Sequence, residues 1–414
     1  MIWLGLALFS LLSPRASAAQ IVPPNERIVI LISLDAFRWD YLQKFQPTNL
    51  SRLAREGVHA KRLIPAFPSL TFPNHYTIVT GLWPEHHGII GNSFYDPIFK
   101  TNYNAFNSSS SQSRWWGGEP IWATAIKQGR RANCMFWPGS QAEIGGVRPT
   151  EWTTFDKKIE PTQCVDTVLG WLEQPAATRP GFVTMYFHQP DTAGHHDGPD
   201  SPELATAVAQ VDAAIGRLVA GIRRLKLEAA VNLVIVSDHG MAEISRERLI
   251  ALPDFVDLNK VQVDFAGAVA GLRPLDGNVA ALYNSFKTKE NHFRIYRREK
   301  MPARYHFRDN DRIPPVVFVA DEGWFISKRT ATEQAGKSFE KATHGFDPNL
   351  SSMGATFIAW GPAFHRNATI GPVENIHIYN LLCATLGLKP APNDGDDRLV
   401  KRVLTKEATT SMLH

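Results

Sequence analysis

The stretch RIVILISLD, residues 27–35, decides the fold class. Its side chains are almost all apolar and show no alternation with polar ones until the run stops at Asp35. A strand with one wet face alternates apolar and polar residues, whereas a strand covered on both faces reads as a continuous apolar run. We therefore predict a strand over Arg27–Leu34 in the middle of a sheet that has helices on both sides.

Segments of the same kind recur along the chain and alternate with helical patterns. The helix that opens at Pro202 is the clearest, because apolar residues recur in it every three or four positions as far as Leu225. Strands alternating with helices predict an α/β fold with a mostly parallel central sheet. The other predicted strands are Ala132–Phe136, Pro180–Phe187, Ala230–Val236 and Ala355–Trp360, and the other helices are Thr48–Glu56, Glu119–Gln128 and Ile376–Leu386.

Residues 260–330 break this pattern. They contain short strand-like runs at Val261–Ala268 and Val316–Val319, a polar helix near Ser285–Glu299, and a cluster of Lys and Arg at 287–312. A basic cluster of this kind is most simply a solvated face. We predict a small α+β insertion subdomain at 260–330, inside a main α/β domain made of 20–259 and 331–414.

The first residues, 1–19, read MIWLGLALFSLLSPRASAA. The apolar run is too short to span a bilayer, and the small residues Ala16-Ser17-Ala18 form a cleavage pattern, so we predict a removed signal peptide. No later segment reads as a membrane span, which predicts a soluble protein that is secreted or periplasmic. The net charge of +4 is spread along 414 residues, which argues against a nucleic-acid-binding surface.

The chain has three cysteines. Export permits disulfides, so Cys134 and Cys164 could pair and leave Cys383 as a buried thiol in an apolar run. No Cys-x-x-Cys pair occurs, which argues against a zinc site built from thiolates.

A second informative stretch, FPSLTFPNHYTIVTGLWPEHHGIIGN, runs from Phe67 to Asn92. It predicts a helix that begins near Thr71, has Pro73 in its first turn and ends at Gly81. Taken alone, Thr71 reads most simply as a helix N-cap. A hydroxyl at a helix start is also well placed for phosphate, because backbone N–H groups and the positive end of the helix dipole meet there.

Acidic and histidine side chains follow several of the predicted strands. Singly, each of these residues has a structural reading, such as a helix cap or a loop histidine. Together they supply three carboxylates and three imidazoles at the carboxyl edge of one sheet, where α/β proteins bind ligands. That donor set suits two Zn²⁺ ions better than Mg²⁺ or Ca²⁺, and a pair of metals can clamp an in-line displacement at phosphorus. The residues are Asp35, Asp191, His195, Asp238, His239 and His344.

The motifs around these residues resemble those of the nucleotide pyrophosphatase/phosphodiesterase family of the alkaline phosphatase superfamily. The matching pieces cover the chain from about residue 27 to its end, in the family's order, and as a set they are highly specific. They are ISLDAFRWDYL at 32–42, the Phe67–Asn92 stretch, FWPGS at 136–140, QPDTAGHHDGP at 189–199, SDHGM at 237–241 and THGFDP at 343–348.

The resemblance implies an alkaline-phosphatase-like fold and assigns two Zn²⁺ ions to the six residues. One ion would be held by Asp191, His195 and His344, and the other by Asp35, Asp238 and His239. Thr71 matches the nucleophile, which also touches the second metal, and Asn92 matches a residue that hydrogen-bonds a phosphate oxygen. Phe72 matches an aromatic that stacks on a base. Phe155, with Trp152 close by, lies near the position of a second aromatic that is often Tyr. His75, His86 and His87 fall outside the implied metal set.

The resemblance further implies hydrolysis of nucleotide phosphodiester and pyrophosphate bonds to nucleoside 5′-monophosphates through a phosphothreonine at Thr71. Asn92 and backbone N–H groups at the helix start would stabilise charge on the phosphate. The nearest alternative is the same chemistry on lysophospholipid or choline phosphodiesters, although Phe72 and the aromatics at 152–155 favour a flat base.

Three other functions are weaker. A phosphomonoesterase would want an additional cation such as Arg in the nucleophile stretch, and a sulfatase would want Cys or Ser followed by Pro and Arg at fixed spacing. The Phe67–Asn92 stretch has neither feature. A non-catalytic metal-binding or adhesion module would have little use for both the complete ligand set and Thr71.

Overall fold

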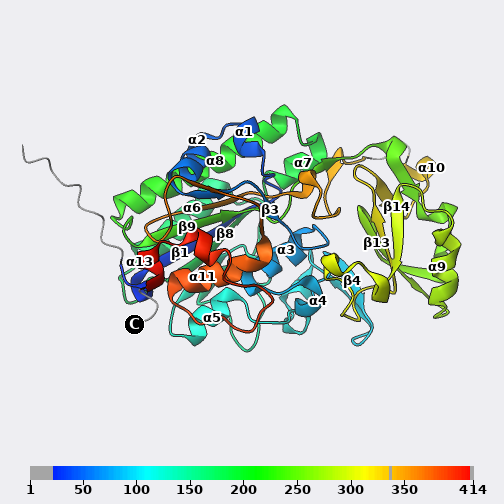
Figure 1. Ribbon diagram of the computed structural model, residues 1–414, viewed down its shortest axis with the longest axis horizontal. Helices are drawn as coiled ribbons and strands as arrows, with labels where there is room; N and C mark the ends of the chain where they lie inside the picture. Colours follow the sequence, from blue (N-terminus) through cyan, green and yellow to red (C-terminus); the bar gives the residue numbers. More distant parts are fainter. Residues whose placement is uncertain (1–21, 335–337, 411–414) are drawn as a thin grey trace, which may run out of the picture.

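A central eight-stranded sheet organises the computed structural model, which describes residues 22–334 and 338–410 (Figure 1). The predicted signal peptide at 1–19 lies outside the described residues. The strand order is β19-β2-β18-β9-β1-β8-β6-β7. The strands are β1 (Ile28–Leu34), β2 (Val58–Ala60), β6 (Ala132–Met135), β7 (Glu151–Thr153), β8 (Phe182–Phe187), β9 (Val231–Val236), β18 (Phe357–Trp360) and β19 (Ala368–Ile370).

The pairing confirms a mostly parallel sheet. Strand β1 lies between β9 and β8 and is parallel to both, with Ile30 level with Leu233 and Val183. Strand β18 runs antiparallel to both of its neighbours, β9 and β2. All seven residues of β1 are buried, as expected for a strand covered on both faces.

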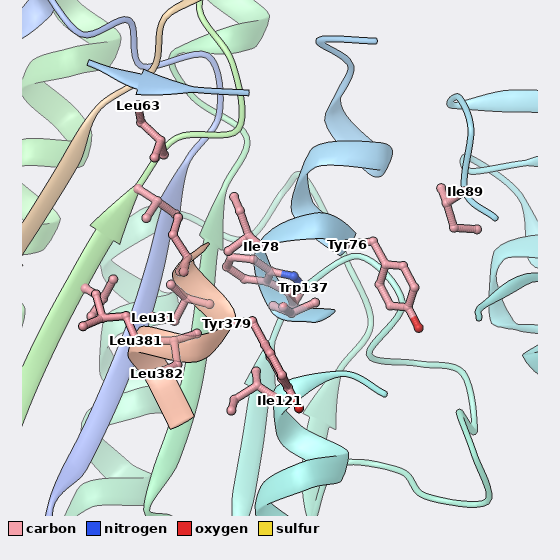
Figure 2. Close-up of a cluster of buried hydrophobic side chains, with 14 of the residues drawn as sticks. Leu31, Leu63, Tyr76, Ile78, Ile89, Ile121, Trp137, Tyr379, Leu381 and Leu382 are labelled. Carbon is pink, nitrogen blue, oxygen red and sulfur yellow. The ribbon is translucent and has the colours of Figure 1, made fainter. Parts of the chain in front are cut away.

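Helices cover both faces of the sheet, as the sequence predicts (Figure 1). Successive side chains of a strand point to opposite faces, so Val29 and Leu31 join one core while Ile30 and Ile32 join the other. The first core packs against α3 (Thr71–Thr80), α5 (Ile121–Lys127) and α11 (Ile378–Leu386), and the second against α2 (Thr48–Glu56), α6 (Pro161–Glu173) and α8 (Pro202–Arg224). Figure 2 shows Leu31 beside Leu381 and Leu382 of α11, with Ile78 of α3 facing them and Tyr76 on the opposite side of the same helix.

A second, antiparallel sheet forms the lobe at the right of Figure 1, in the order β12-β13-β15-β14. Its strands are β12 (Val261–Phe265), β13 (Val269–Pro274), β14 (Phe293–Arg297) and β15 (Val316–Ala320). They pack with α9 (Val279–Lys287) around a separate core that contains Leu272, Phe286 and Phe318. The content of 260–330 is thus strands and a helix, while its division from the main domain stays a prediction.

The predicted helix near Ser285–Glu299 is wrong. Helix α9 begins earlier, where the Asn278 side chain accepts the Ala281 N–H, and it ends at Lys287. His292 then takes a left-handed backbone conformation, with φ 58°, and the following FRIYR segment pairs with β15 as β14. Long-range pairing therefore overrides the local helical preference of the polar residues in this stretch.

Two segments outside the predicted strands and helices also contain ordered structure. The polar segment after β8 includes helix α7 (Asp191–Asp197), and residues 104–118 bury Trp115 and Trp116. The remaining helices are α1 (Tyr41–Lys44), α4 (Pro84–His87), α10 (Ala331–Gln334), α12 (Val400–Val403) and α13 (Lys406–Thr410). The remaining strands are β3 (Leu63–Ile64), β4 (Ser93–Asp96), β5 (Thr101–Asn104), β10 (Ala242–Glu243), β11 (Leu249–Ala251), β16 (Phe325–Ser327), β17 (Ala342–Thr343) and β20 (Val373–Glu374).

The three cysteines are all free and buried, so the pair of Cys134 and Cys164 is not formed. Cys134 belongs to the core on one face of the sheet and Cys164 to the core on the other, so the sheet itself separates their thiols. Cys383 is buried in α11, as predicted.

Among the described residues, α8 is long and apolar enough to cross a membrane by length and composition, contrary to the prediction that no segment after residue 19 would be. More than half of its apolar window is buried inside the structure, against α2 and α6 and the second core. The same apolar stripe is what a core helix requires.

Candidate active site

Three neighbouring parallel strands deliver the predicted acidic ligands. Asp35 follows β1, Asp238 follows β9, and Asp191 opens α7 after β8. Because β9, β1 and β8 are adjacent and run the same way, their carboxyl ends meet at one edge of the sheet. The Asp191 N–H donates to the Asp35 carbonyl oxygen at 3.0 Å, which ties two of these segments together.

The six predicted ligands meet in two overlapping groups. His239 Nε2 lies 2.9 Å from Asp238 Oδ2 and 3.6 Å from Asp35 Oδ1, which is the first predicted trio. Asp191 Oδ1 lies 3.4 Å from His195 Nε2 and 3.6 Å from His344 Nε2, which is the second.

The division between the groups is less sharp than the resemblance implies. The His239 ring stacks on the His344 ring with centroids 3.6 Å apart, so the compact group around Asp191 takes in His239 and His344. His195 approaches the same Asp191 oxygen from one turn further along α7. His239 therefore stands between the two groups.

Each histidine is held in the same way. The Nδ1–H groups of His195, His239 and His344 donate to the backbone carbonyls of Ala342, Gly240 and Ser69, at 3.0, 2.9 and 2.9 Å. A carbonyl oxygen can only accept, so in the neutral ring the proton is on Nδ1 and the Nε2 lone pair is free. All three free Nε2 atoms point toward carboxylate oxygens.

The carboxylates complement this arrangement. Asp35 Oδ1, Asp191 Oδ1 and Asp238 Oδ2 are buried and have no hydrogen-bond partner in the described structure. Buried acceptors that face other acceptors are costly unless a cation lies between them. Neutral imidazoles and carboxylates also form a donor set that zinc favours, so the residues fit two metal ions.

The electrostatics of the site point the same way. Burial raises the pKa of Asp35, and the nearby charges of Asp238 and Asp191 raise it further. Burial opposes protonation of His195, yet Asp191 and then Glu340 raise its pKa to about 11. A raised His195 pKa indicates that the carboxylates around it give the cluster an excess of negative charge, which a bound cation would neutralise.

Thr71 stands beside this cluster and is not a helix cap. Leu70 occupies the N-cap position of α3, without a side-chain cap, and Thr71 is the first helical residue. Its Oγ1 lies 3.3 Å from His239 Nε2. The hydroxyl is therefore directed to the ligand cluster instead of to its own helix, and Gly81 ends the helix as predicted.

Asn92 meets the same helix start. Its Oδ1 accepts the Phe72 N–H at 3.0 Å, which leaves the amide N–H₂ group to donate elsewhere. The Phe72 N–H is thereby used, Pro73 has none, and the Asn74 N–H donates to Leu70. The expected cradle of backbone N–H groups for phosphate is reduced to the Thr71 N–H, and the Asn92 side chain is the donor that the fold presents.

The two predicted base-stacking aromatics lie in different surroundings. Phe72 contacts Phe106 and Trp116, with ring centroids 5.8 and 6.4 Å away. Phe155 is 48% exposed and lies edge-on to Tyr186 at 5.7 Å, beside a shallow pocket that both residues line. Trp152, in β7, instead packs under the Arg148 guanidinium.

Two residues of the site, Tyr186 and His75, were given no role from the sequence. Tyr186 donates its phenol hydrogen to Asp35 Oδ2 at 2.6 Å, and His75 Nδ1 donates to the Thr71 carbonyl at 2.8 Å. His75 lies four residues after Thr71 on a helix, a spacing that could have revealed it. Tyr186 lies in a buried strand whose pattern carries no signal of this kind.

The other histidines of the nucleophile stretch lie outside the metal groups. His86 contacts Asp394 at 2.7 Å, and His87 Nε2 lies 3.1 Å from Thr77 Oγ1.

Comparison with known proteins gives a consistent result. Residues 29–347 match the family model described as type I phosphodiesterase/nucleotide pyrophosphatase. The chain is 37% identical over 418 residues to ectonucleotide pyrophosphatase/phosphodiesterase family member 1 of Mus musculus, a match that covers 98% of the chain and 45% of the relative. It is 39% identical over 384 residues to a venom phosphodiesterase of Crotalus durissus collilineatus, covering 89% of the chain and 45% of that relative.

Solved structures agree with the fold. Murine ectonucleotide pyrophosphatase/phosphodiesterase 5, an inactive threonine-to-alanine variant in complex with AMP, superposes with a TM-score of 0.87 at 32% identity. The match covers 92% of this chain and 100% of that one. The chain spans less than half the length of the curated relatives that it matches.

Proposed function

Because this chain belongs to the type I phosphodiesterase/nucleotide pyrophosphatase family, we propose that it is a zinc-dependent hydrolase of small nucleotides. It would cleave phosphodiester and pyrophosphate bonds and release nucleoside 5′-monophosphates. The names of its relatives describe an ectoenzyme and a venom enzyme, both of which act outside cells. These names support the proposal that this protein is secreted or periplasmic.

One observation carries this proposal. Six ligand side chains turn unpartnered oxygens and free Nε2 atoms toward one another, and a threonine hydroxyl that caps nothing lies against them. A structural cluster would pair its buried acceptors with donors, whereas a site for cations leaves them open.

We assign Asp35, Asp238 and His239 to one zinc ion, with Thr71 beside it, and Asp191, His195 and His344 to the other. When bound, the two ions supply the positive charge that lowers the pKa of a hydroxyl group or water and stabilises a departing oxygen. The location of His239 next to both groups favours a shared, closely spaced pair of sites.

The chain's own residues then have separate tasks. The Thr71 hydroxyl loses its proton to solvent and attacks phosphorus in line, which breaks the P–O bond to the leaving group; the leaving oxygen takes up a proton and a phosphothreonine remains. Water then attacks the same phosphorus, the bond to Thr71 Oγ1 breaks, Thr71 regains its proton, and the nucleoside 5′-monophosphate is released. The Asn92 N–H₂ group donates to a non-bridging phosphate oxygen, because its own carbonyl is fixed by the Phe72 N–H. Phe72 and Phe155 would hold a flat base. At position 155 a Phe keeps the stacking surface but lacks the hydrogen bond of a Tyr.

A substrate panel with zinc-loaded protein tests the proposal. Dinucleotide esters, nucleoside triphosphates and nucleotide sugars should be cleaved to 5′-monophosphates, and lysophosphatidylcholine and simple phosphomonoesters should react far more slowly. Preferential release of choline phosphate or lipid products would assign the alternative lipid substrate class, and no hydrolysis of any phosphodiester would overturn the enzyme assignment.

A threonine pair tests the nucleophile. Thr71→Ala should nearly abolish turnover and leave zinc binding intact, whereas Thr80→Ala should keep full activity. Thr80 lies on the same helix, but its hydroxyl donates to the Tyr76 carbonyl at 2.7 Å. Normal turnover in Thr71→Ala would remove Thr71 from the mechanism.

A further inference from the structure

Tyr186 stands out among the residues around the ligand cluster. Its phenol oxygen lies 2.6 Å from Asp35 Oδ2 and donates to it, while Asp35 Oδ1 has no partner and faces His239 Nε2 at 3.6 Å. The two oxygens of Asp35 are thus used differently. One is fixed by the phenol and the other is left for a cation.

Four of the other five ligands have a hydrogen bond to the main chain. The three histidines donate to backbone carbonyls, and Asp238 Oδ1 accepts the backbone N–H of Ala36 at 3.2 Å. The Ala36 backbone adopts a left-handed conformation, with φ 54°, in presenting that N–H. The Asp35 carboxylate instead accepts from one side chain, the Tyr186 phenol, which is a donor that a substitution can remove.

The Tyr186 ring is itself held in place. It lies edge-on to the His75 ring, with centroids 5.1 Å apart, and at 5.7 Å from the Phe155 ring. His75 is fixed in turn, because Ser33 Oγ lies 2.8 Å from its Nε2 and its Nδ1 donates to the Thr71 carbonyl. A phenol held between such neighbours can dictate the rotamer of Asp35, since it has little freedom to follow the carboxylate.

We propose that Tyr186 is a positioning residue for the metal site, whose phenol orients Asp35 so that Oδ1 alone is presented to the ion beside Thr71. This inference rests on the proposed function, because it concerns the same zinc site. Partners of this kind around a metal ligand typically change metal affinity by about 10–100-fold when they are removed. Tyr186 needs no contact with the substrate to have this effect.

Zinc binding measured without substrate provides the test. Competition with a chromogenic chelator should show two zinc equivalents in the parent protein. In Tyr186→Phe, one equivalent should bind about 10–100-fold more weakly and the other should be unchanged. Tyr103→Phe is the matched control, because Tyr103 is fully buried and its hydroxyl has no hydrogen-bond partner.

Two further measurements distinguish an effect through Asp35 from a general loss of packing. In an Asp35→Ala background, adding Tyr186→Phe should change zinc affinity by less than about twofold, since the residue through which it acts is gone. In the single variant, kcat should fall at limiting zinc and recover at excess zinc, while KM for a dinucleotide ester stays the same because the ring remains.

The outcomes separate this inference from the proposed function. A parent protein that binds no zinc would overturn the proposed function itself. A parent that binds two equivalents, with Tyr186→Phe binding both equally well, would overturn only the role of Tyr186. An equal loss of affinity in the presence and absence of Asp35 would also overturn it.

Discussion

Replacing Asn92 tests the site most directly, because the structure separates two tasks of one side chain. Asn92 Oδ1 accepts the Phe72 N–H at 3.0 Å and so holds the start of α3, and its N–H₂ group is left to meet the phosphate. Asn92→Ala removes both functions. Asn92→Asp keeps an acceptor for the Phe72 N–H but has no N–H₂ to donate.

The expected magnitudes follow from these contacts. Loss of a preorganised donor to transition-state charge costs about 2.7–4 kcal/mol, or roughly 10²–10³ in kcat. Loss of the acceptor for one N–H costs about 1 kcal/mol of folding stability, which lowers the melting temperature by roughly 2 °C in a protein of this size. Both variants should therefore lose activity, and only Asn92→Ala should also lose stability.

Steady-state hydrolysis of a chromogenic nucleotide ester, thermal unfolding and zinc content measure the three quantities separately. Zinc content should match that of the parent in Asn92→Ala, which shows that the activity loss does not come from the metal site. Activity within threefold of the parent in Asn92→Ala would refute the assignment of Asn92 to the phosphate. A fall in melting temperature in Asn92→Asp as large as in Asn92→Ala would refute the division of tasks.

Three further predictions concern the surrounding fold. Gly240→Ala would place a Cβ 2.0 Å from the Ser352 carbonyl oxygen, so thermal unfolding should show a loss of about 1–3 kcal/mol in the free energy of unfolding. Because the Gly240 carbonyl accepts the Nδ1–H of His239, metal analysis should also show weaker zinc binding. Burial lowers the pKa of His87 to about 3, below the value of about 6.5 in an unfolded chain, so the unfolded state binds more protons between these values. Stability from His87 is therefore complete above about pH 6.5 and falls by up to ~1.4 kcal/mol per pH unit below it, so His87→Gln should show a flatter stability profile between roughly pH 4 and 6. Finally, thiol titration of the unfolded, unreduced protein should detect all three cysteines, and fewer thiols would contradict the separation of Cys134 and Cys164 by the sheet.

The sequence predicted the fold class because its strongest signal is periodicity. The unbroken apolar run at residues 27–34 indicated a strand covered on both faces, and β1 is buried throughout. The prediction was wrong where periodicity was weak, as at Ser285–Glu299, where pairing with β15 makes part of the polar segment a strand. The tertiary structure decided that Cys134 and Cys164 do not form a disulfide, because spacing along the chain carries no information about which face of a sheet a thiol occupies.

For the site, the sequence by itself determined which side chains could take part. Asp35, Asp238 and Asp191 follow strands, and parallel neighbouring strands must bring their ends to one edge. Only the tertiary structure decided which atom of each ligand is free, that His239 belongs to both groups, and that Tyr186 fixes Asp35. The physical reason is that strand order follows from the burial of many apolar residues, whereas the orientation of one carboxylate depends on a few contacts between residues far apart in the chain.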